Sequence, residues 1–465
     1  MLKMDKDSKE KIKVAVIGGG PSGLSAAEYI RELSPHIDVT IYERNHYFGG
    51  KCCTVLADGT IANGRPGGYE MGAGVFTPNS RLYKDTEELL EKYNLKTDRA
   101  LPPGLKPIEY LKDGLDAWHE THPVSLYNLF KYPGRFFRGL YGFMKFGIDI
   151  LRFQRFAVDL AARPKKLAQT MSERYPAELN RVLALFMQGY GYAHEPDPGL
   201  TPPMLYYHQY MQPDMMGREK INIDKGMEKR LYKLVTGTQG IWRKISETYS
   251  DDKARLNSEV ISVKRLPGGV EITTSKGTEE YDYAVVAAPF KQTLKFMDYS
   301  DGERELVSKM QYNHYVTVLC KAENIEACCT VNVPVNVDRN RYGDLLLAYR
   351  RYTDTNILIA YLYIEPGTSP SDSEIINRVE AGLRDGCNGR LIEKSFAKVF
   401  HWDDYFGHLG SEDILNNWYR NFNETIQAQN NTLFVCSGLH METVGSSVQY
   451  SRWAVKKYFQ KWLET

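Results

Sequence analysis

Two short apolar runs near the amino terminus predict the first buried elements of the chain. Residues 14–17 are Val-Ala-Val-Ile and residues 39–42 are Val-Thr-Ile-Tyr. Runs of this length that are rich in β-branched residues are typical of strands buried in a parallel sheet. A glycine-rich turn at residues 18–23 and a helical segment separate them. The order of elements is therefore strand, turn, helix and strand.

The residues of the turn and the residue after the second strand carry a chemical signal. Gly18 allows a tight turn, Gly20 lets a pyrophosphate approach the backbone, and Gly23 lets the helix pack closely against the strand. Free N–H groups near Ser22, at the start of the helix, favour an anion. Glu43 ends the second strand, where its carboxylate can accept hydrogen bonds from ribose hydroxyls. Together these features predict a dinucleotide-binding βαβ unit.

A second set of small residues distinguishes a flavin from a nicotinamide cofactor. Gly49-Gly50 precedes Lys51-Cys52, and residues 69–74 read Tyr-Glu-Met-Gly-Ala-Gly. With these motifs the chain resembles the FAD-binding superfamily of amine oxidases and phytoene desaturases. The resemblance implies FAD, with Gly50 and Lys51 along its diphosphate and ribityl chain. Isomerases of this superfamily that carry a similar G-G-K-C hold FAD without a covalent link, so the resemblance implies non-covalent binding.

Three later segments extend the resemblance, namely a strand at Val260 beside the adenine edge, a strand at residues 283–289, and a closing segment at residues 433–438. In the family an acid usually follows the last glycine, but Leu439 stands here, so the ribityl contact is expected from elsewhere. The cofactor-binding residues implied by the resemblance are Gly18, Gly20, Pro21, Ser22, Gly23, Glu43, Arg44, Gly50, Lys51, Cys52, Gly72, Ala73, Gly74, Val260, Ala288, Pro289, Ser437, Gly438, Ser447 and Val448.

Within that superfamily the chain is similar to the FAD-dependent polyunsaturated fatty acid isomerases of propionibacteria. The similarity includes Tyr190-Gly191-Tyr192-Ala193-His194 and the stretch from Tyr405-Phe406 to Trp418-Tyr419. Those isomerases hold a fatty carboxylate with an arginine, where this chain has Ile108 with only Lys106 nearby. Arg and Lys are not equivalent in binding a carboxylate, so a free fatty acid is disfavoured. The pocket residues implied by the resemblance are Phe76, Ile108, Tyr190, Met215, Met216, Trp402 and Tyr405.

The resemblance also implies the architecture. It predicts an α/β fold in which a Rossmann-like FAD-binding domain of the glutathione reductase type is interwoven with a mixed-sheet substrate domain and a helical lid. A short helix is expected at residues 226–234, where the chain returns to the nucleotide domain. The expected FAD-binding domain comprises residues 1–80, 225–295 and 425–465. The mostly helical lid and substrate region is expected at 81–224, and the mixed-sheet substrate domain at 296–424.

Composition narrows the class of protein. At 465 residues and 42% hydrophobic content the chain exceeds what one hydrophobic core usually supports. Its formal net charge is only +1, which gives no reason to expect a nucleic-acid partner. Seven cysteines form no C-x-x-C pair, and reduced thiols in a cytoplasmic protein are expected. The sequence contains no run of eighteen apolar residues, so no membrane-spanning helix is expected.

Residues 126–156 form a cationic amphipathic stretch. Phe136, Leu140, Phe143, Gly147 and Ile150 recur at helical spacing, and the six cations of the stretch are opposed by a single acid. Three interpretations remain open, namely a lid packed on the protein, a peripheral membrane contact that admits a lipophilic substrate, and a core helix with snorkelling cations. A lid is favoured.

The motifs leave the outcome of the reaction open. The superfamily resemblance favours a double-bond isomerase that moves a hydride from and back to an apolar unsaturated substrate, with no metal and no catalytic triad required. The alternative is an FAD-dependent amine oxidase or desaturase with net oxidation of its substrate. A third interpretation, a non-catalytic protein of the same fold that binds lipidated or prenylated partners, is disfavoured by the intact region around Lys51 and Ser437-Gly438.

Overall fold

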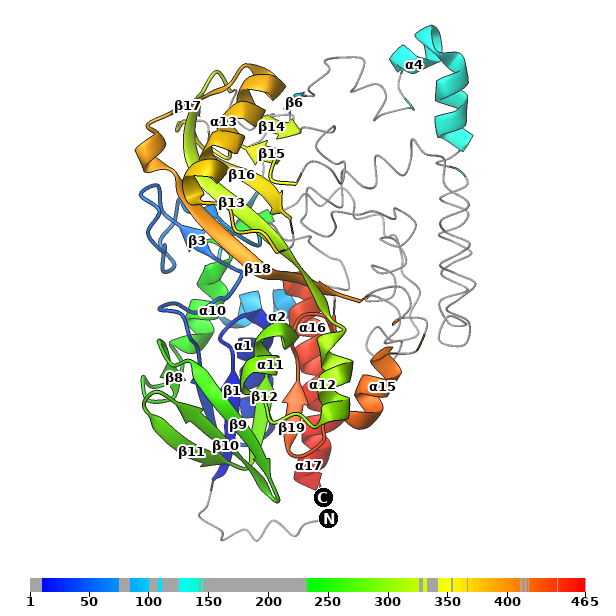
Figure 1. The fold of residues 1–465 in the computed structure, drawn as a ribbon. Coiled ribbons are helices and arrows are strands. Elements are labelled where there is room, and N and C mark those ends of the chain that lie inside the picture. The colour runs from blue at the N-terminus through cyan, green and yellow to red at the C-terminus, as the bar shows by residue number, and fades with distance from the viewer. Residues whose placement is uncertain are drawn as a thin grey trace.

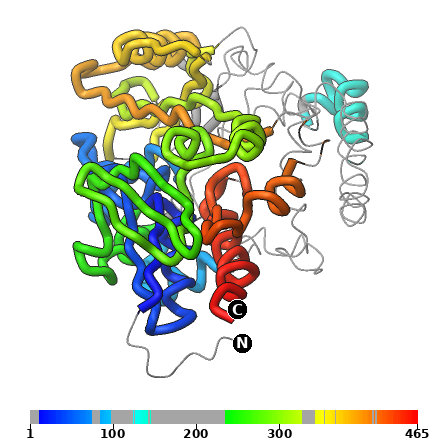
Figure 2. Tube along the Cα trace, turned by 60° about the horizontal axis from the view of Figure 1, so that its bottom comes forward, coloured from blue at the N-terminus to red at the C-terminus, as the bar shows by residue number. Residues whose placement is uncertain are grey.

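The protein is described by a computed structural model with two main sheets, one in each half (Figures 1 and 2). The structure describes residues 11–74, 84–99, 108–110, 124, 126–141, 144, 232–325, 329–332, 342–352, 354–365, 367–409, 413, 416, 418–440 and 442–464.

A five-stranded sheet in which all pairings are parallel forms the centre of one half. Its order is β19-β12-β1-β2-β8. Chain segments far apart in sequence supply these strands: β1 (Ile12–Ile17), β2 (Ile37–Tyr42), β8 (Ala254–Arg255), β12 (Tyr283–Val286) and β19 (Thr432–Phe434). The inner strands are almost wholly apolar and buried, because helices cover a parallel sheet on both faces.

Helix α1 (Pro21–Leu33) connects β1 to β2 and packs against α16 (Val444–Ala454) and α10 (Gln239–Ser246). Helix α2 (Lys84–Lys92) also contacts α16. A π-helical turn (Val455–Phe459) and α17 (Gln460–Glu464) continue the chain after α16. The helices and the sheet share one large hydrophobic core. The amino-terminal and carboxy-terminal elements thus form one packed unit (Figure 1).

A small antiparallel sheet lies beside this unit. It consists of β9 (Val260–Leu266), β10 (Gly269–Thr274) and β11 (Gly277–Tyr281). The burial of β10 alternates strictly along the strand, as expected for a strand with one buried face. Helix α11 (Phe290–Phe296) packs on β9, and α12 (Asp301–Ser308) follows with a Ser300–Glu303 capping box.

The second half is built on a mixed sheet of seven strands. Its path is β17-β13-β16-β15-β14-β6, and β18 also pairs with β13. Only the β14–β6 pairing is parallel, and the others are antiparallel. The strands are β6 (Ile108–Tyr110), β13 (Gln311–Glu323), β14 (Cys329–Asn332), β15 (Leu345–Tyr349), β16 (Ile357–Ile364), β17 (Arg390–Ile392) and β18 (Lys398–His408).

Helix α13 (Asp372–Cys387) covers one face of the mixed sheet, and a 3-10 turn (Lys394–Phe396) follows β17. Tyrosine and tryptophan side chains gather in separate clusters that include Tyr315, Tyr405 and Trp402. A parallel sheet with flanking helices combined with a mixed sheet confirms the predicted fold class.

Short elements join these parts. Strands β3 (Thr54–Val55) and β4 (Tyr69–Glu70) form one ribbon, and β5 (Thr97–Arg99) and β7 (Tyr232–Leu234) form another. The helix predicted at residues 226–234 is wrong for 232–234, because the backbone of these residues pairs with β5. Residues 226–231 lie outside the described residues. Helices α4 (Leu126–Lys131) and α15 (Trp418–Thr425) complete the described elements.

The region predicted as mostly helical also contributes strands. Both β5 and β6 lie within residues 81–224, and β6 extends the mixed sheet by pairing with β14. The sequence missed them because each is only three residues long, which is too short for a periodic signal. Among the described helices, none is long and apolar enough to cross a membrane.

Candidate active site

The glycine turn after β1 is shaped by close main-chain contacts. Gly18 has a φ of +108°, and a Cβ at Gly23 would lie 1.9 Å from the carbonyl oxygen of Gly18. Helix α1 therefore starts directly against the end of β1. Its N-cap, Gly20, supplies no side-chain cap, and the first turn contains no acid. The first N–H groups of α1 are thus left for an external acceptor.

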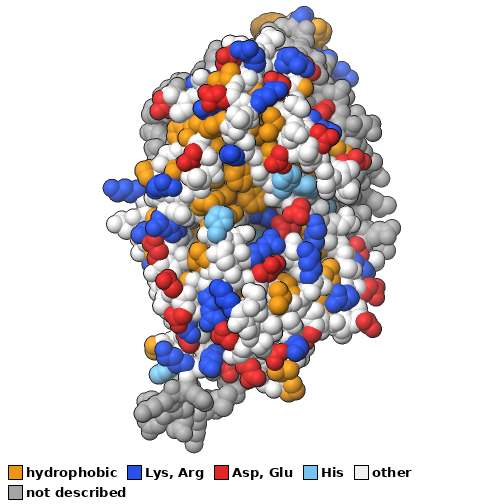
Figure 3. Space-filling model, turned by 60° about the vertical axis from the view of Figure 1, so that its left-hand side comes forward, with side chains coloured by type: hydrophobic (Ala, Val, Ile, Leu, Met, Phe, Trp, Pro, Cys, Tyr) orange, Lys and Arg blue, Asp and Glu red, His pale blue; other side chains and the backbone are white. Residues whose placement is uncertain are grey.

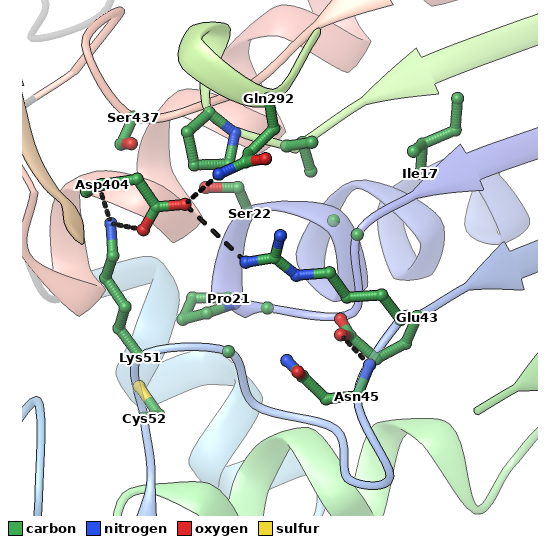
Figure 4. Close-up of a pocket in the computed structure, with 18 of the residues that line it drawn as sticks. Ile17, Pro21, Ser22, Glu43, Asn45, Lys51, Cys52, Gln292, Asp404 and Ser437 are labelled. Carbon is green, nitrogen blue, oxygen red and sulfur yellow. Dashed lines mark hydrogen bonds and ion pairs between the residues drawn. The ribbon is translucent and has the colours of Figure 1, made fainter. Parts of the chain in front are cut away.

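Glu43 lies at the end of β2 and is 5% exposed. Its carboxylate accepts the Gly19 N–H at 2.7 Å through Oε2. It also accepts the Asn45 N–H at 2.8 Å through Oε1 (Figure 4). Burial raises the pKa of Glu43 above its usual value. A carboxylate has about four acceptor positions, so Glu43, which lines the cavity, has capacity to accept from a further hydroxyl donor.

The second glycine pair brings another loop against this turn. Gly49 and Gly50 have φ values of +126° and +53°. A Cβ at Gly50 would lie 3.1 Å from the Cα of Gly20, and a Cβ at Gly72 would lie 1.8 Å from the Lys51 carbonyl oxygen. Only main chain fits at these contacts. The two loops together form a floor of backbone beneath the cavity.

The cavity above this floor has a volume of about 540 Å³ and lies between the two halves of the molecule. On the face shown in Figure 3, hydrophobic side chains gather in a hollow that is surrounded by charged and histidine side chains. Eighteen of the predicted site residues line the cavity: Gly18, Gly20, Pro21, Ser22, Gly23, Glu43, Arg44, Gly50, Lys51, Cys52, Ala73, Val260, Ala288, Pro289, Trp402, Tyr405, Ser437 and Ser447.

The other predicted residues do not line this cavity or are not described. Gly72 and Gly74 lie in the adjoining loop, Gly438 (φ +98°) packs beside Met310, and Val448 is fully buried in α16. Ile108 lies in β6, where its backbone pairs with Cys329. Phe76, Tyr190, Met215 and Met216 lie outside the described residues.

Lys51 is the centre of a charged cluster that the sequence did not predict. Its Nζ donates to the Asp404 carbonyl oxygen at 2.6 Å, lies 3.7 Å from Asp404 Oδ1, and forms an ion pair with Glu442. Arg44 and Gln292 approach Asp404 Oδ2 at 3.8 and 3.4 Å (Figure 4). Two cations and two carboxylates thus meet at one side of the cavity.

The pKa shifts agree with these contacts. Burial alone would lower the pKa of Lys51, but Glu442 and Asp404 raise it above its usual value. Burial alone would raise the pKa of Asp404, but Lys51 and Arg44 lower it. Burial raises the pKa of Glu442 despite the attraction of Lys51. Lys51 therefore stays protonated, and Asp404 is the carboxylate most firmly held in its charged form.

Glu442 takes a position that the sequence left open. Leu439, which stands where an acid was expected, is 2% exposed and belongs to the core. Glu442, three residues later, lines the cavity. Its Oε2 is buried and accepts no hydrogen bond from any described residue. An acid shortly after the expected position was the only sequence signal for this group.

The closing segment brings a second helix start to the cavity. Thr443 caps α16 by accepting the Ser446 N–H at 3.2 Å. His440 Nε2 lies 3.2 Å from the hydroxyl of Ser22 in α1, and the Ser451 hydroxyl donates to the Ser22 carbonyl oxygen. Ser437 Oγ is buried without a hydrogen bond to any described residue. Both helix starts, α1 and α16, are therefore held together at the cavity.

Strand β18 provides the opposite wall with aromatic side chains. The Tyr405 ring stacks on Tyr315 at a centroid distance of 5.1 Å, and Lys51 Nζ lies 5.5 Å from its centroid. Trp402 Nε1 donates to Thr317 Oγ1 at 3.2 Å. The strand is irregular here, with register shifts against β13.

Main-chain contact ties this wall to the closing segment. Phe406, next to Tyr405, has a φ of +51°. A Cβ at the following residue, Gly407, would lie 3.0 Å from the Cα of Gly438. Strand β18 therefore passes directly against the turn at Gly438, with no room for a side chain between them.

Four cysteine thiols are buried, and burial raises the pKa of each of them. Cys52, Cys53, Cys320 and Cys436 are buried and form no disulfide. Burial raises the pKa of Cys52 and of Cys53 to about 12. Because the thiolate is the nucleophile, Cys52 is a poor candidate for covalent attachment of a cofactor.

The residues present fit an extended dinucleotide with a flavin ring. Two helix starts and the Glu43 carboxylate line the cavity, and the buried oxygens Ser437 Oγ and Glu442 Oε2 lack hydrogen bonds to described residues. A buried polar group without a partner is costly, so a ligand that bonds to these oxygens would be stabilised. Asp404, Gln292, His440 and Glu442 are among the polar residues of the cavity that sequence reasoning missed.

Comparisons with known proteins agree with this geometry. The family model for flavin-containing amine oxidoreductases matches residues 21–425. The structure of a conjugated-linoleic-acid-producing fatty acid isomerase from P. acnes is similar with a TM-score of 0.66 and 22% identity, covering 96% of this chain and 99% of that chain. Putrescine oxidase bound to putrescine is similar with a TM-score of 0.63 and 15% identity, covering 97% and 99%.

A curated relative matches over a short stretch. Coproporphyrinogen III oxidase of Staphylococcus aureus is 41% identical over 56 residues, which is 12% of each protein. The chain therefore matches only a small part of that relative's length.

Proposed function

Because the chain belongs to the flavin-containing amine oxidoreductase family and is an FAD-dependent enzyme, we propose that it isomerises a double bond in an apolar, unsaturated small molecule. The observation that carries this proposal is the wall of the cavity. Trp402, Tyr405 and Phe400 line it opposite the backbone floor. Apolar pockets with a few fixed polar groups are typical of sites for such ligands.

The charges around Lys51 favour a substrate whose reacting group is uncharged. Asp404 and Glu442 would attract the ammonium group of an amine, but Lys51 and Arg44 already balance their charges. A bound amine would have to compete with these cations. The similarity in fold to the fatty acid isomerase, over nearly the whole of both chains, also supports an isomerase over an amine oxidase.

The described side chains need only orient the substrate and exclude water. FAD, when bound, would supply the hydride-accepting and hydride-donating chemistry that a shift of the double bond without net oxidation requires. The stacked Tyr315 and Tyr405 rings and the Trp402 indole, fixed by its bond to Thr317, give the wall a defined shape. The raised pKa values of Cys52 and Cys53 are consistent with no thiol redox step.

The anchoring end of the substrate is proposed from the sequence. Ile108 stands where the related isomerases carry an arginine, which favours a neutral ester over a free acid. The pocket is proposed to include Phe76, Tyr190, Met215 and Met216 as well. We propose the domain limits given by the sequence, with FAD bound by residues 1–80, 225–295 and 425–465.

The test is an anaerobic incubation of the purified yellow protein with linoleic acid, its methyl ester and putrescine in separate reactions. We expect a conjugated diene of unchanged mass from the ester and no hydrogen peroxide after air is admitted. Bleaching of the flavin absorbance by putrescine, with a product two hydrogens lighter, would instead establish an amine oxidase. A desaturase would give the same mass loss from the fatty acid or its ester.

A further inference from the structure

An exposed apolar stripe lies on the helical segments at residues 126–131 and 133–141. Leu126, Phe130, Phe137, Tyr141 and Met144 are 74%, 83%, 58%, 64% and 60% exposed. Leu126 and Phe130 are four residues apart, as are Phe137 and Tyr141, so each pair shares one side of its helical segment. Large apolar side chains thus face solvent at helical spacing.

This stripe is not the one that the sequence indicated. Phe136 and Leu140, which the helical spacing singled out, are half-buried. Residue 133 is a proline, which separates α4 from the next helical segment. The segment therefore has an inner apolar side and a second, exposed one.

The stripe is unusual within the described surface. Among the described residues, eleven large hydrophobic side chains are exposed, and seven of them lie between Val124 and Met144. The other four are scattered at residues 33, 235, 261 and 266. Single exposed apolar residues are common, whereas a cluster indicates an interaction surface. Figures 1 and 2 show α4 at the edge of the molecule, apart from both main sheets.

Cations are interspersed with the apolar residues. Lys131 and Arg135 lie 5.4 and 5.0 Å from the centroid of the Tyr132 ring, and Arg138 follows one helical turn later. The sequence contains no acid between residues 124 and 144. Residues 124–144 therefore combine three positive charges with exposed aromatic rings.

We propose that this surface, the 124–144 face, binds peripherally to a membrane that contains anionic lipids. Apolar side chains of amphipathic segments enter the boundary between headgroups and acyl chains, and nearby Lys and Arg side chains are attracted to anionic headgroups. A second copy of the chain fits less well, because residues 124–144 include no acid that could pair with the cations of the same segment in the other copy. The proposal does not depend on the reaction that the enzyme catalyses.

The test uses the FAD-loaded enzyme in co-sedimentation with phosphatidylcholine vesicles, with and without about one-quarter phosphatidylglycerol. We expect binding to the anionic vesicles that weakens with added salt. The F130S/F137S variant should bind to the vesicles at least about tenfold more weakly than the unmodified protein. The K131Q/R135Q/R138Q variant should lose its preference for anionic vesicles, at about fivefold per charge. L266S, a substitution at a scattered exposed residue, is the matched control and should bind normally.

Three outcomes would overturn the proposal. They are no binding to anionic vesicles, binding that neither 124–144 variant reduces, and a dimer in light scattering that F130S/F137S dissociates. Flavin absorbance and circular dichroism of each variant show whether it remains folded. A variant that loses its fold is replaced by the single substitution Phe130→Ser, which affects a side chain 83% exposed.

Discussion

The floor and the wall of the cavity are built by different means. The floor is main chain, in which Gly20 and Gly50 approach each other and Gly23 lies against Gly18. The wall is made of side chains on β18, a strand with register shifts against its neighbour. A backbone floor can be specified by a few glycines at fixed spacing, whereas a side-chain wall depends on contacts along the whole sheet. The comparison predicts that substitutions in the floor and in the wall will have different consequences.

The largest effect is expected in the floor, from Gly23→Val. The Cβ position lies 1.9 Å from the Gly18 carbonyl oxygen, so α1 must move away from β1. We expect the free energy of unfolding to fall by about 3 kcal/mol or more and FAD to be lost. Denaturant unfolding and the flavin-to-protein absorbance ratio measure the two effects. Gly302→Ala is the matched control because its Cβ would meet no atom within 4 Å, and equal losses in both variants would contradict the expectation.

An intermediate effect is expected where floor and wall meet, from Lys51→Met. This substitution removes the cation that Asp404 and Glu442 share, at a cost of about 3 kcal/mol, and leaves Asp404 with Arg44 nearby. The double variant K51M/E442Q should recover part of this loss, because the buried Glu442 charge that lost Lys51 is gone. Thermal and denaturant unfolding of the four proteins in this cycle give the coupling. If E442Q adds its own loss in full to that of K51M, the two side chains are not coupled.

The smallest effect on stability is expected in the wall, from Trp402→Phe. The variant loses the hydrogen bond from Nε1 to Thr317 Oγ1, which corresponds to about 1 kcal/mol. FAD content should be unchanged, while the rate with the substrate found in the anaerobic screen should fall. Flavin absorbance and steady-state rates separate these readouts. Loss of FAD from this variant would show that substitutions in the wall affect cofactor binding as substitutions in the floor do, which would contradict the comparison.

The sequence predicts the floor well because its signals are local. The turn at residues 18–23 and Glu43 lie within one βαβ unit, and their spacing alone indicates how they meet. The fold class follows from the same motifs and from the apolar strands. The helix predicted at residues 226–234 is wrong for residues 232–234. These residues form β7, which pairs with β5, and the sequence gives no local signal for a contact between such distant segments.

The charged cluster could not be predicted in the same way. Lys51 meets Asp404 and Glu442 across 353 and 391 residues of sequence, and no local pattern marks such a pairing. Asp404 follows Asp403 in a strand rich in aromatic residues, and this local sequence indicates neither an ion-pair partner nor a cavity. The exposed stripe at Phe130 and Phe137 was missed because helical spacing identifies an apolar side but does not say whether another element covers it.

The contact between Gly407 and Gly438 has a consequence for the empty protein. Strand β18 touches the turn at Gly438, which precedes α16, with no side chain between them. We expect this turn, whose Ser437 lines the cavity, to be less ordered when FAD is absent. The Trp402 and Tyr405 rings on β18 should then be less firmly held. Hydrogen exchange at residues 402–408 should therefore quicken when FAD is stripped, even though the coenzyme never needs to form a bond with those amides.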